Sequence, residues 1–506
     1  MKARNPVMTT VLSFPAARWL PLAAALFLAG CMSHPLAPVT ADAALPVPAH
    51  FSNSAEGQGQ NWTTAAPAEA QSRGAWWLGF ADPVLTGLVE RAADGNTSIQ
   101  EAAARLAEAR SLLRTADAQR APQLGVSTGA VRQAGITTTG SAVPATVVTA
   151  GLNLSYELDL FGRLSKASDA ARLDAQARAA LLQSTRLLVQ AEVAQTYLQL
   201  RAVQAEHGLV TASLAAYRDT LHLTQRRFQA GDVAELDVAR VQTEVAATEA
   251  EALSLAQQQA QLQHALAVLV GEVASGFAVP AAAAEAALPV VPPGVPATVL
   301  ARRPDVAAAQ ASVMAAQARV GVAEAAWFPA ITLTGNGGHA SPELGDLFKW
   351  SARSWGIGAL LSLPLFDGGQ RAAQEEGARA QLEAAMAAHR GQVLTAFREV
   401  EDQLSALRLL EGQAEAQGRA VQSARRATQL SDSRYRNGLV SQLELLDARR
   451  SELRSQRHAL QVRTAQYTAT VGLIRALGGD WKTVPTSDTV APQSLVVSHQ
   501  TDIADK

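Results

Sequence analysis

Apolar and polar residues alternate along four short segments of the chain, near 123–132, 147–160, 331–340 and 354–365. Side chains of an extended strand point to opposite faces in turn, so this alternation predicts four β-strands, each with one apolar and one polar face. In the second segment, Leu152 and Leu154 fall on the apolar face, while Asn153, Glu157 and Asp159 fall on the polar face. The carboxylates predict that the polar face borders water.

The number of strands limits how such a sheet can be completed. Four strands do not close a barrel, and an open sheet edge is not tolerated in lipid, so other copies of the chain must supply the remaining strands. Two copies would give eight strands filled by side chains, whereas three would give twelve strands and leave a passage. Strands of a soluble β-sandwich alternate in the same way, but aromatic residues near the strand ends favour a membrane girdle. These aromatic residues are Tyr156, Phe161, Trp327, Phe328, Trp350, Trp355 and Phe366.

A long stretch without proline follows each pair of strands. Each stretch exceeds 60 residues, and at 1.5 Å per residue it predicts a helix of roughly 100 Å. Apolar and small residues recur at heptad spacing from Leu173 to Leu198, as in coiled coils whose helices pack closely. Gly231 and Gly438 mark hairpin-tip turns, after which a second helix returns. The expected helices are 166–229 and 233–270 in the first half and 370–436 and 440–477 in the second.

This order of elements occurs twice in the chain. Residues 121–270 and 328–477 align at a spacing of about 207 residues, which matches Pro122 with Pro329. In the same alignment, Phe161-Gly162-Arg163 corresponds to Phe366-Asp367-Gly368-Gly369. The spacing is too long for a solenoid repeat and therefore predicts an internally duplicated half-molecule.

The only cysteine follows an apolar segment near the N-terminus. Leu28-Ala29-Gly30-Cys31 ends an apolar run that starts near Leu20 and is too short to span a bilayer as a helix. This segment resembles a lipobox. The resemblance implies that a signal peptide is cleaved before Cys31 and that Cys31 is acylated with fatty acids such as palmitate. Met32 follows where lipoproteins of the inner membrane usually carry Asp, so the resemblance implies transfer to the outer membrane. The alternative is a buried thiol or an ordinary signal peptide with an unrelated cysteine.

Charge and residue spacing argue against several function classes. After residue 30 the chain carries 40 basic and 45 acidic residues, a net charge of −5 that gives nucleic acid little reason to bind. The nine histidines show no metal-ligand spacing, and no phosphate loop or nucleophile elbow occurs. We therefore expect no enzyme, no metal and no cofactor apart from the covalent lipid on Cys31. A single cysteine also predicts no internal disulfide.

Segments rich in Pro, Ala, Ser and Thr mark linkers and tails between these elements. The predicted organisation begins with a signal peptide at 1–30 and a lipidated linker at 31–75. A first repeat follows at 76–298 and ends in an equatorial segment at 271–298. A second repeat covers 299–481, and a C-terminal tail covers 482–506.

Three segments resemble the TolC-like outer-membrane efflux proteins, specifically the lipoprotein branch called NodT-type. The most specific begins with Leu300-Ala301-Arg302-Arg303-Pro304-Asp305-Val306 and continues through Trp327-Phe328-Pro329 into the third strand. The others are Trp76-Trp77 with Asp82-Pro83, and Leu363-Pro364-Leu365-Phe366-Asp367-Gly368-Gly369. Pro304 and Asp305 also predict a helix start, because proline suits the first turn and Asp complements the helix dipole.

The resemblance implies a mainly α-helical fold with a membrane β-barrel. Three copies would join four strands each into a twelve-stranded barrel in the outer membrane, and the long antiparallel hairpins would form a tunnel in the periplasm. Such a homotrimer is a passive conduit for drugs or other small molecules. The resemblance further implies docking to a periplasmic membrane-fusion adaptor and an inner-membrane pump of the RND class, with the lipid anchor holding the protein to the outer membrane.

By the same resemblance, the tips of the hairpins carry a periplasmic gate. Where the family has a narrowing ring, this sequence has Leu443 and Asp447; Asp237 and Tyr435 match other positions that close the aperture. Three copies of Asp447 near an axis would repel one another and favour cations. The alternative is that Asp447 and Asp237 are solvated helix carboxylates. Val440 stands where some relatives carry a gate arginine, so no arginine lock is expected at that position.

Two other functions fit parts of the sequence. A lipid-anchored periplasmic coiled-coil scaffold or adaptor would need the helices, but it would not need an apolar face beside a polar one. An outer-membrane duct for type I protein secretion would need the helices as well as a sheet with one apolar and one polar face, although a lipid anchor is less expected in such a duct.

Overall fold

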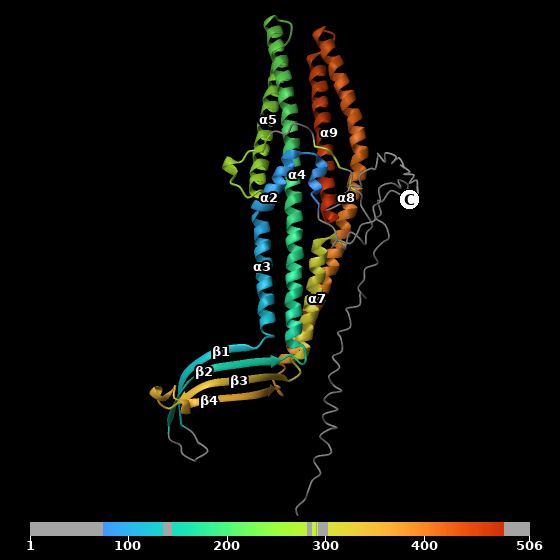
Figure 1. The fold of residues 1–506 in the computed structure, drawn as a ribbon. Helices are drawn as coiled ribbons and strands as arrows, with labels where there is room; N and C mark the ends of the chain where they lie inside the picture. Colours follow the sequence, from blue (N-terminus) through green and yellow to red (C-terminus); the bar gives the residue numbers. More distant parts are fainter. Residues whose placement is uncertain (1–73, 135–143, 281–285, 290, 292–301, 480–506) are drawn as a thin grey trace, which may run out of the picture. The chain divides into compact units, whose positions relative to one another are not determined.

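The computed structural model describes residues 74–134, 144–280, 286–289, 291 and 302–479 (Figure 1). The predicted signal peptide, Cys31 and the C-terminal tail lie outside these residues. Across the described ranges, no helix combines the length and the apolar character needed to cross a bilayer.

The chain divides into two compact units, and each takes segments from both sequence repeats. Among the described residues, the first unit contains those of Leu106–Arg178 and Ala309–Gly391, and the second contains the others. The division does not follow the two repeats, because the second strand of the first repeat pairs along its length with the first strand of the second. The two units are described separately below.

The first unit carries a four-stranded antiparallel sheet in the order β1-β2-β3-β4 (Figure 1). Its strands are β1 (Gln123–Gln133), β2 (Ala145–Leu158), β3 (Ala330–Ser341) and β4 (Arg353–Ser362). One hairpin comes from each repeat, and β2 and β3 join the hairpins. The four predicted strands are therefore present, with ends that differ by a few residues.

The pairing register gathers the large apolar side chains on one face of the sheet. On this face Val126 is 81% exposed and Ile357 is 85% exposed. Leu152 and Trp355 lie in the same row as Val126. Val126 pairs with Leu152, Leu152 pairs with Gly337, and Gly337 pairs with Trp355. The exposed apolar residues on this face are Leu124, Val126, Leu152, Leu154, Leu333, Trp355, Ile357 and Leu361. An exposed apolar face of this size marks a surface that something other than water covers.

The second and fourth strands end earlier than predicted. β2 stops at Leu158, because Asp159 turns away to accept hydrogen bonds from the backbone N–H groups of Leu164 and Ser165 at 2.9 and 2.7 Å. β4 stops at Ser362, two residues before Pro364, which has no N–H to donate to a strand ladder.

The two carboxylates predicted for the polar face both have partners near the end of β2. Glu157 pairs with the Arg163 guanidinium at 2.8 Å. Asp159 lies beyond β2 and caps the helix that follows. Glu157 therefore lies on the polar face as predicted, whereas the prediction is wrong for Asp159, which leaves the sheet to cap the helix.

Two pairs of long helices follow the strands. They are α4 (Arg163–Gln229) with α5 (Glu235–Leu269), and α8 (Gln370–Arg436) with α9 (Gln442–Ala476). The long helices have 67 residues each and the return helices have 35 each. α8 begins directly after Asp367-Gly368-Gly369. The Asp367 carboxylate accepts hydrogen bonds from the backbone N–H groups of Gly369 and Arg371. Asp159 and Asp367 thus start the two long helices in the same way.

Shorter helices complete the fold. They are η3 (Trp76–Phe80), α2 (Pro83–Gly95), α3 (Thr97–Ala118), η4 (Ala274–Gly276), α7 (Pro304–Ala325), η5 (Leu344–Asp346) and η6 (Trp350–Ala352). In the second unit, Asp82 caps α2 and accepts a hydrogen bond from the Tyr197 hydroxyl at 2.7 Å. Burial raises the pKa of that hydroxyl, and the bond to Asp82 raises it further.

Arg303, just before α7, ties this helix to the second hairpin within the second unit. Its guanidinium donates to Asp305 at 2.6 Å, to Glu399 of α8 at 2.7 Å and to the Ala476 carbonyl of α9 at 3.1 Å. Arg303 is only 5% exposed. Burial alone would raise the pKa of Asp305, but the hydrogen bonds from Arg303 outweigh it and lower that pKa. The predicted helix start at Pro304 is present, and it carries a buried ion cluster.

Candidate functional site

The two hairpin tips, both in the second unit, end their long helices with one motif. Gly231 and Gly438 adopt φ values of +82° and +73°. The N–H of the residue after each glycine donates to a carbonyl five residues earlier, at 2.9 Å in both tips. This is the Schellman arrangement, which favours glycine because only glycine takes a left-handed conformation without strain. The duplication therefore extends to the geometry of the turns.

Leu443 and Asp447 lie on the first turns of α9, directly after the second tip. Leu443 is 47% exposed, and the Asp447 side chain is 64% exposed. Asp447 lies 3.5 Å from Arg450 on its own helix. An exposed leucine beside an exposed carboxylate is available to a surface outside this chain.

Asp237 occupies the first turn of α5, at the first tip. Its carboxylate lies 3.7 Å from Arg240, and its side chain is 34% exposed. A carboxylate at this position also faces the positive end of the helix dipole. Asp237 thus stabilises the start of α5 through Arg240 and the helix dipole, whether or not it has a role in a gate.

Tyr435, in the last turn of α8, is buried, with 4% exposure. Its ring packs under the Arg227 guanidinium of α4, 4.9 Å from the ring centre. Its hydroxyl is buried and has no hydrogen-bond partner among the described residues. Tyr435 therefore contacts the first hairpin of its own chain.

Beyond the tips, α9 packs along the first hairpin. We call this contact the hairpin seam, and it comprises the residues of α9 from Gln442 to Arg457 and those of α4 and α5 that they touch. Leu446 packs into a cluster with Tyr217 and Val241. Leu453, seven residues later, packs against a cluster that contains Val210. The spacing of seven residues is the coiled-coil repeat, so α9 lies along the hairpin as a coiled-coil partner.

Arginines of α9 hold the seam together. The Arg449 guanidinium donates to the Ala216 carbonyl at 2.8 Å and to the Thr220 hydroxyl at 2.7 Å, both on α4. It also pairs with Asp432 of α8 at 3.1 Å. One side chain thereby joins three helices.

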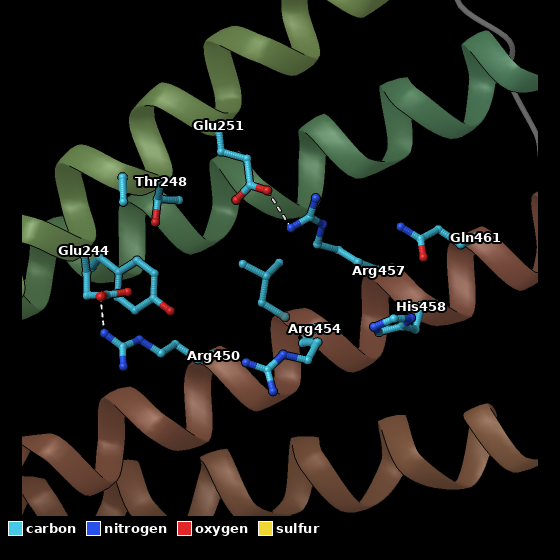
Figure 2. Close-up of a pocket in the computed structure, with 11 residues that line it drawn as sticks. Glu244, Thr248, Glu251, Arg450, Arg454, Arg457, His458 and Gln461 are labelled. Carbon is cyan, nitrogen blue, oxygen red and sulfur yellow. Dashed lines mark hydrogen bonds and ion pairs between the residues drawn. The ribbon is translucent and has the colours of Figure 1, made fainter.

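Arg450 and Arg457 reach the first hairpin from the next positions (Figure 2). Arg450 pairs with Glu244 of α5, and this hydrogen bond raises the pKa of Arg450. Arg457 pairs with Glu206 of α4 at 2.6 Å and with Glu251 of α5 at 2.5 Å. Burial lowers the pKa of Arg457, but its two carboxylate partners outweigh burial and raise it. Both guanidinium groups therefore remain charged.

A hollow of about 420 Å³ lies beside these ion pairs, between α5 and α9 (Figure 2). Its lining includes both Glu–Arg pairs as well as Arg454 and His458. Water and salt can enter a polar hollow of this size, so the ion pairs at the seam are screened more than pairs in a dry core. The seam therefore combines a buried apolar stripe with ion pairs that added salt can weaken.

Sequence reasoning placed the candidate residues at the tips but missed the seam. One signal was present: Glu244 and Glu251 are seven residues apart on α5, and Arg450 and Arg457 are seven apart on α9. Matched heptad spacing of opposite charges predicts facing helices. Only the structure pairs these two helices with each other.

The exposed residues of the second tip and the hairpin seam both belong to α9. The exposed Leu443 and Asp447 lie on the same helix as the seam and border it, since Asp447 is 3.5 Å from the seam residue Arg450. A shift of α9 off the first hairpin would move these exposed residues and would break the seam's ion pairs.

Comparisons with known proteins agree with this architecture. The family model described as "Outer membrane efflux protein" matches twice, at residues 88–272 and 295–479, once in each repeat. The outer membrane protein OprJ of Pseudomonas aeruginosa is 33% identical over 433 residues, which cover 83% of this chain and 90% of OprJ. The solvent efflux pump outer membrane protein SrpC of Pseudomonas putida is 32% identical and covers 91% of this chain and 98% of its own.

Solved structures have the same fold. The outer-membrane channel OprN superposes with a TM-score of 0.79 at 30% identity and covers 86% of this chain and 98% of its own. The outer membrane protein VceC of Vibrio cholerae superposes with a TM-score of 0.75 at 28% identity and covers 82% of this chain and all of its own. With both repeats matched, the chain is an outer-membrane efflux channel and belongs to the outer membrane efflux protein family.

Proposed function

We propose that three copies of this chain assemble into a passive duct through the outer membrane, with the hairpin tips as its periplasmic gate. The observation that carries the proposal is the sheet of the first unit, which exposes a continuous group of large apolar side chains on one face, whereas the other carries mostly small or polar side chains, with Val131 and Leu360 as exceptions. A duct needs both faces, one towards lipid and one towards water.

The height of the apolar face supports insertion in a membrane. Trp355 and Leu361 bound its exposed apolar residues on β4 and are six residues apart, so the band spans roughly 20 Å at about 3.4 Å per residue. Outer-membrane proteins present an apolar band about 25 Å tall. The next row beyond Trp355 contains His339 and Arg353, which suit the headgroup region.

The edges of the sheet support association with further copies. Within the described residues β1 and β4 each pair on one side alone. These two strands run in opposite directions, since three antiparallel pairings separate them. β4 of one copy can therefore pair antiparallel with β1 of the next, and three copies would close a sheet of twelve strands around a passage.

The gate follows from the trimer. Leu443 and Asp447, exposed in one chain, would face the axis where three copies of α9 converge. The three Asp447 carboxylates would repel one another, and the hairpin seam would supply the contacts that keep α9 in place. Tyr435 and Asp237 would support the gate from within each chain.

Partners and cargo follow from the relatives. These include outer membrane proteins of solvent, toluene and antibiotic efflux pumps. We infer a periplasmic adaptor and an inner-membrane pump of the RND class as partners, and small apolar or amphiphilic molecules as cargo. We further infer that Cys31 carries the lipid anchor; loss of radiolabelled palmitate incorporation in Cys31→Ser would support this.

Electrophysiology of the purified full-length protein tests the proposal. We expect discrete conductance steps in planar bilayers and a hollow three-fold particle in electron microscopy. A solid rod without conductance would overturn the duct and favour a lipid-anchored scaffold or adaptor. Failure of cells that lack the chain to secrete a polypeptide would point to type I protein secretion.

A further inference from the structure

One row of four residues crosses the polar face of the sheet from edge to edge. Gly125 on β1 pairs with Asn153 on β2, Asn153 pairs with Asn336 on β3, and Asn336 pairs with Gly356 on β4. The two asparagines, from opposite repeats, stand side by side in the middle of the sheet, and a glycine stands outside each of them.

The asparagine side chains lie over these glycines. A Cβ atom added to Gly125 would stand 3.0 Å from Oδ1 and 3.2 Å from Nδ2 of Asn153. A Cβ atom added to Gly356 would stand 2.8 Å from Oδ1 of Asn336. Strand side chains ordinarily rise away from the sheet. Here each carboxamide instead leans sideways over the edge strand, into the volume that a methyl group would fill.

Backbone conformation does not explain these two glycines. Neither Gly125 nor Gly356 has a positive φ, so an alanine could adopt either backbone conformation. The next row has a different reason for glycine, since a Cβ at Gly151 would lie 2.8 Å from the Gly337 carbonyl oxygen of the adjoining strand. At Gly125 and Gly356 the colliding atoms belong to the asparagine side chains alone.

The carboxamides stand on a surface without charge. The adjoining rows on the same face carry hydroxyl, amide or no side chains: Gln123, Ser155, Thr334 and Gly358 on one side, and Ser127, Gly151, Gly338 and Ser354 on the other. Glu157, in the row beyond the first of these, is neutralised by Arg163. Asn153 and Asn336 are therefore two neighbouring carboxamides in the middle of an uncharged stretch, and each can both donate and accept hydrogen bonds.

We propose that Asn153 and Asn336 form an uncharged hydrogen-bonding collar in the duct, and that Gly125 and Gly356 hold this collar open. This inference rests on the proposed function, in which the polar face of the sheet lines the passage. Three copies contribute six carboxamides. Because they lie flat, the passage keeps its width, and because they are neutral, it presents no barrier to cargo of either charge.

The test compares the wild type with three variants in planar bilayers, with neutral polyethylene glycols of graded size added to each chamber in turn. In Gly125→Ala with Gly356→Ala, the carboxamides must swing off the sheet, so we expect the largest polymer that still enters from the sheet side to become smaller. Adding Asn153→Ala and Asn336→Ala to that variant should restore the wild-type limit. Gly337→Ala is the matched control, because it adds the same methyl group to the opposite face, where no atom lies within 4 Å.

A second measurement uses substitutions that do not enlarge the side chains. Asn153→Asp with Asn336→Asp should shift the reversal potential in a potassium chloride gradient towards the potassium equilibrium potential. If the alanine variant is not recovered in assembled form, this measurement decides. Wild-type limits in the alanine variant, or an unshifted potential in the aspartate variant, would overturn the collar while leaving the duct intact. A wild-type protein that does not conduct would overturn the proposed function and the collar with it.

Discussion

Arg457→Gln should weaken the hairpin seam and open the proposed gate more often. Arg457 of α9 reaches both helices of the first hairpin, through Glu206 at 2.6 Å and Glu251 at 2.5 Å. The glutamine keeps much of the length and polarity but removes the charge. Any change in gating would then report the ion pairs themselves.

The size of the effect follows from the exposure of the pairs. The Arg457, Glu206 and Glu251 side chains are 30%, 15% and 34% exposed. Pairs of this kind contribute at most about 1 kcal/mol each after solvent screening. Two pairs in each of three copies would amount to about 6 kcal/mol, and since 1.4 kcal/mol is tenfold, the ratio of open to closed duct would rise by up to about 10⁴-fold.

The assay is the open probability of single channels at low and high salt. Wild-type channels should open more often at about 1 M salt, where the Debye length is about 3 Å. Arg457→Gln should open at low salt and respond less to added salt. Arg398→Gln is the matched control, because Arg398 pairs with Asp402 on its own helix α8, at 3.0 Å. Equal open probabilities in the two variants would refute the role of the seam.

Three further predictions concern the tips and the buried cluster. Leu443→Ala with Asp447→Ala should raise the conductance of the closed duct, because it removes the exposed bulk and charge at the tip of α9. Arg303→Ala should lower the free energy of unfolding by about 3 kcal/mol, because Asp305 and Glu399 lose their shared buried partner, although Gln392 and Arg475 remain in contact with them. Thermal unfolding monitored by circular dichroism measures this change. The pKa of Asp305 is lowered from its ordinary 3.8, so its stabilisation is present above about pH 4 and is lost as the pH falls through the folded-state value. Unfolding temperatures recorded between pH 6 and pH 2 should show this loss, and Asp305→Asn should flatten the profile.

Each of these predictions has a contrary outcome. Unchanged conductance in the tip variant would show that Leu443 and Asp447 are solvated side chains with no part in the gate. An Arg303→Ala protein as stable as Arg105→Ala, whose partner lies four residues away on an exposed helix face, would show that the cluster adds little. A pH profile that Asp305→Asn leaves as steep as before would locate the acid sensitivity in other carboxylates.

Much of the fold was predictable from local patterns. Alternation predicted the four strands, since the side-chain period of a strand is two whatever lies beside it. Proline-free heptads ended by Gly231 and Gly438 predicted the hairpins, and both glycines take the left-handed conformation at those turns. These features depend on neighbours within a few residues, so the sequence carries them in full.

The site was predictable only in part. Tyr435 was expected at the hairpin tip and lies there, but its burial against Arg227 of the other hairpin was not predicted. Glu157 was expected on the polar face, and it lies there, but its pairing with Arg163 was not predicted. In both cases the partner depends on how the chain packs, which the pattern around the residue does not encode.

The amino-acid sequence by itself determined the elements of this protein, their order and their repetition. The tertiary structure decided which elements meet: α9 with the first hairpin through Arg457, and Gly125 with Asn153 through the register of the sheet. The physical reason is range. Backbone conformation and side-chain period are set by residues close in the chain, whereas ion pairs and strand register join residues up to 251 positions apart and exist only once the chain has packed.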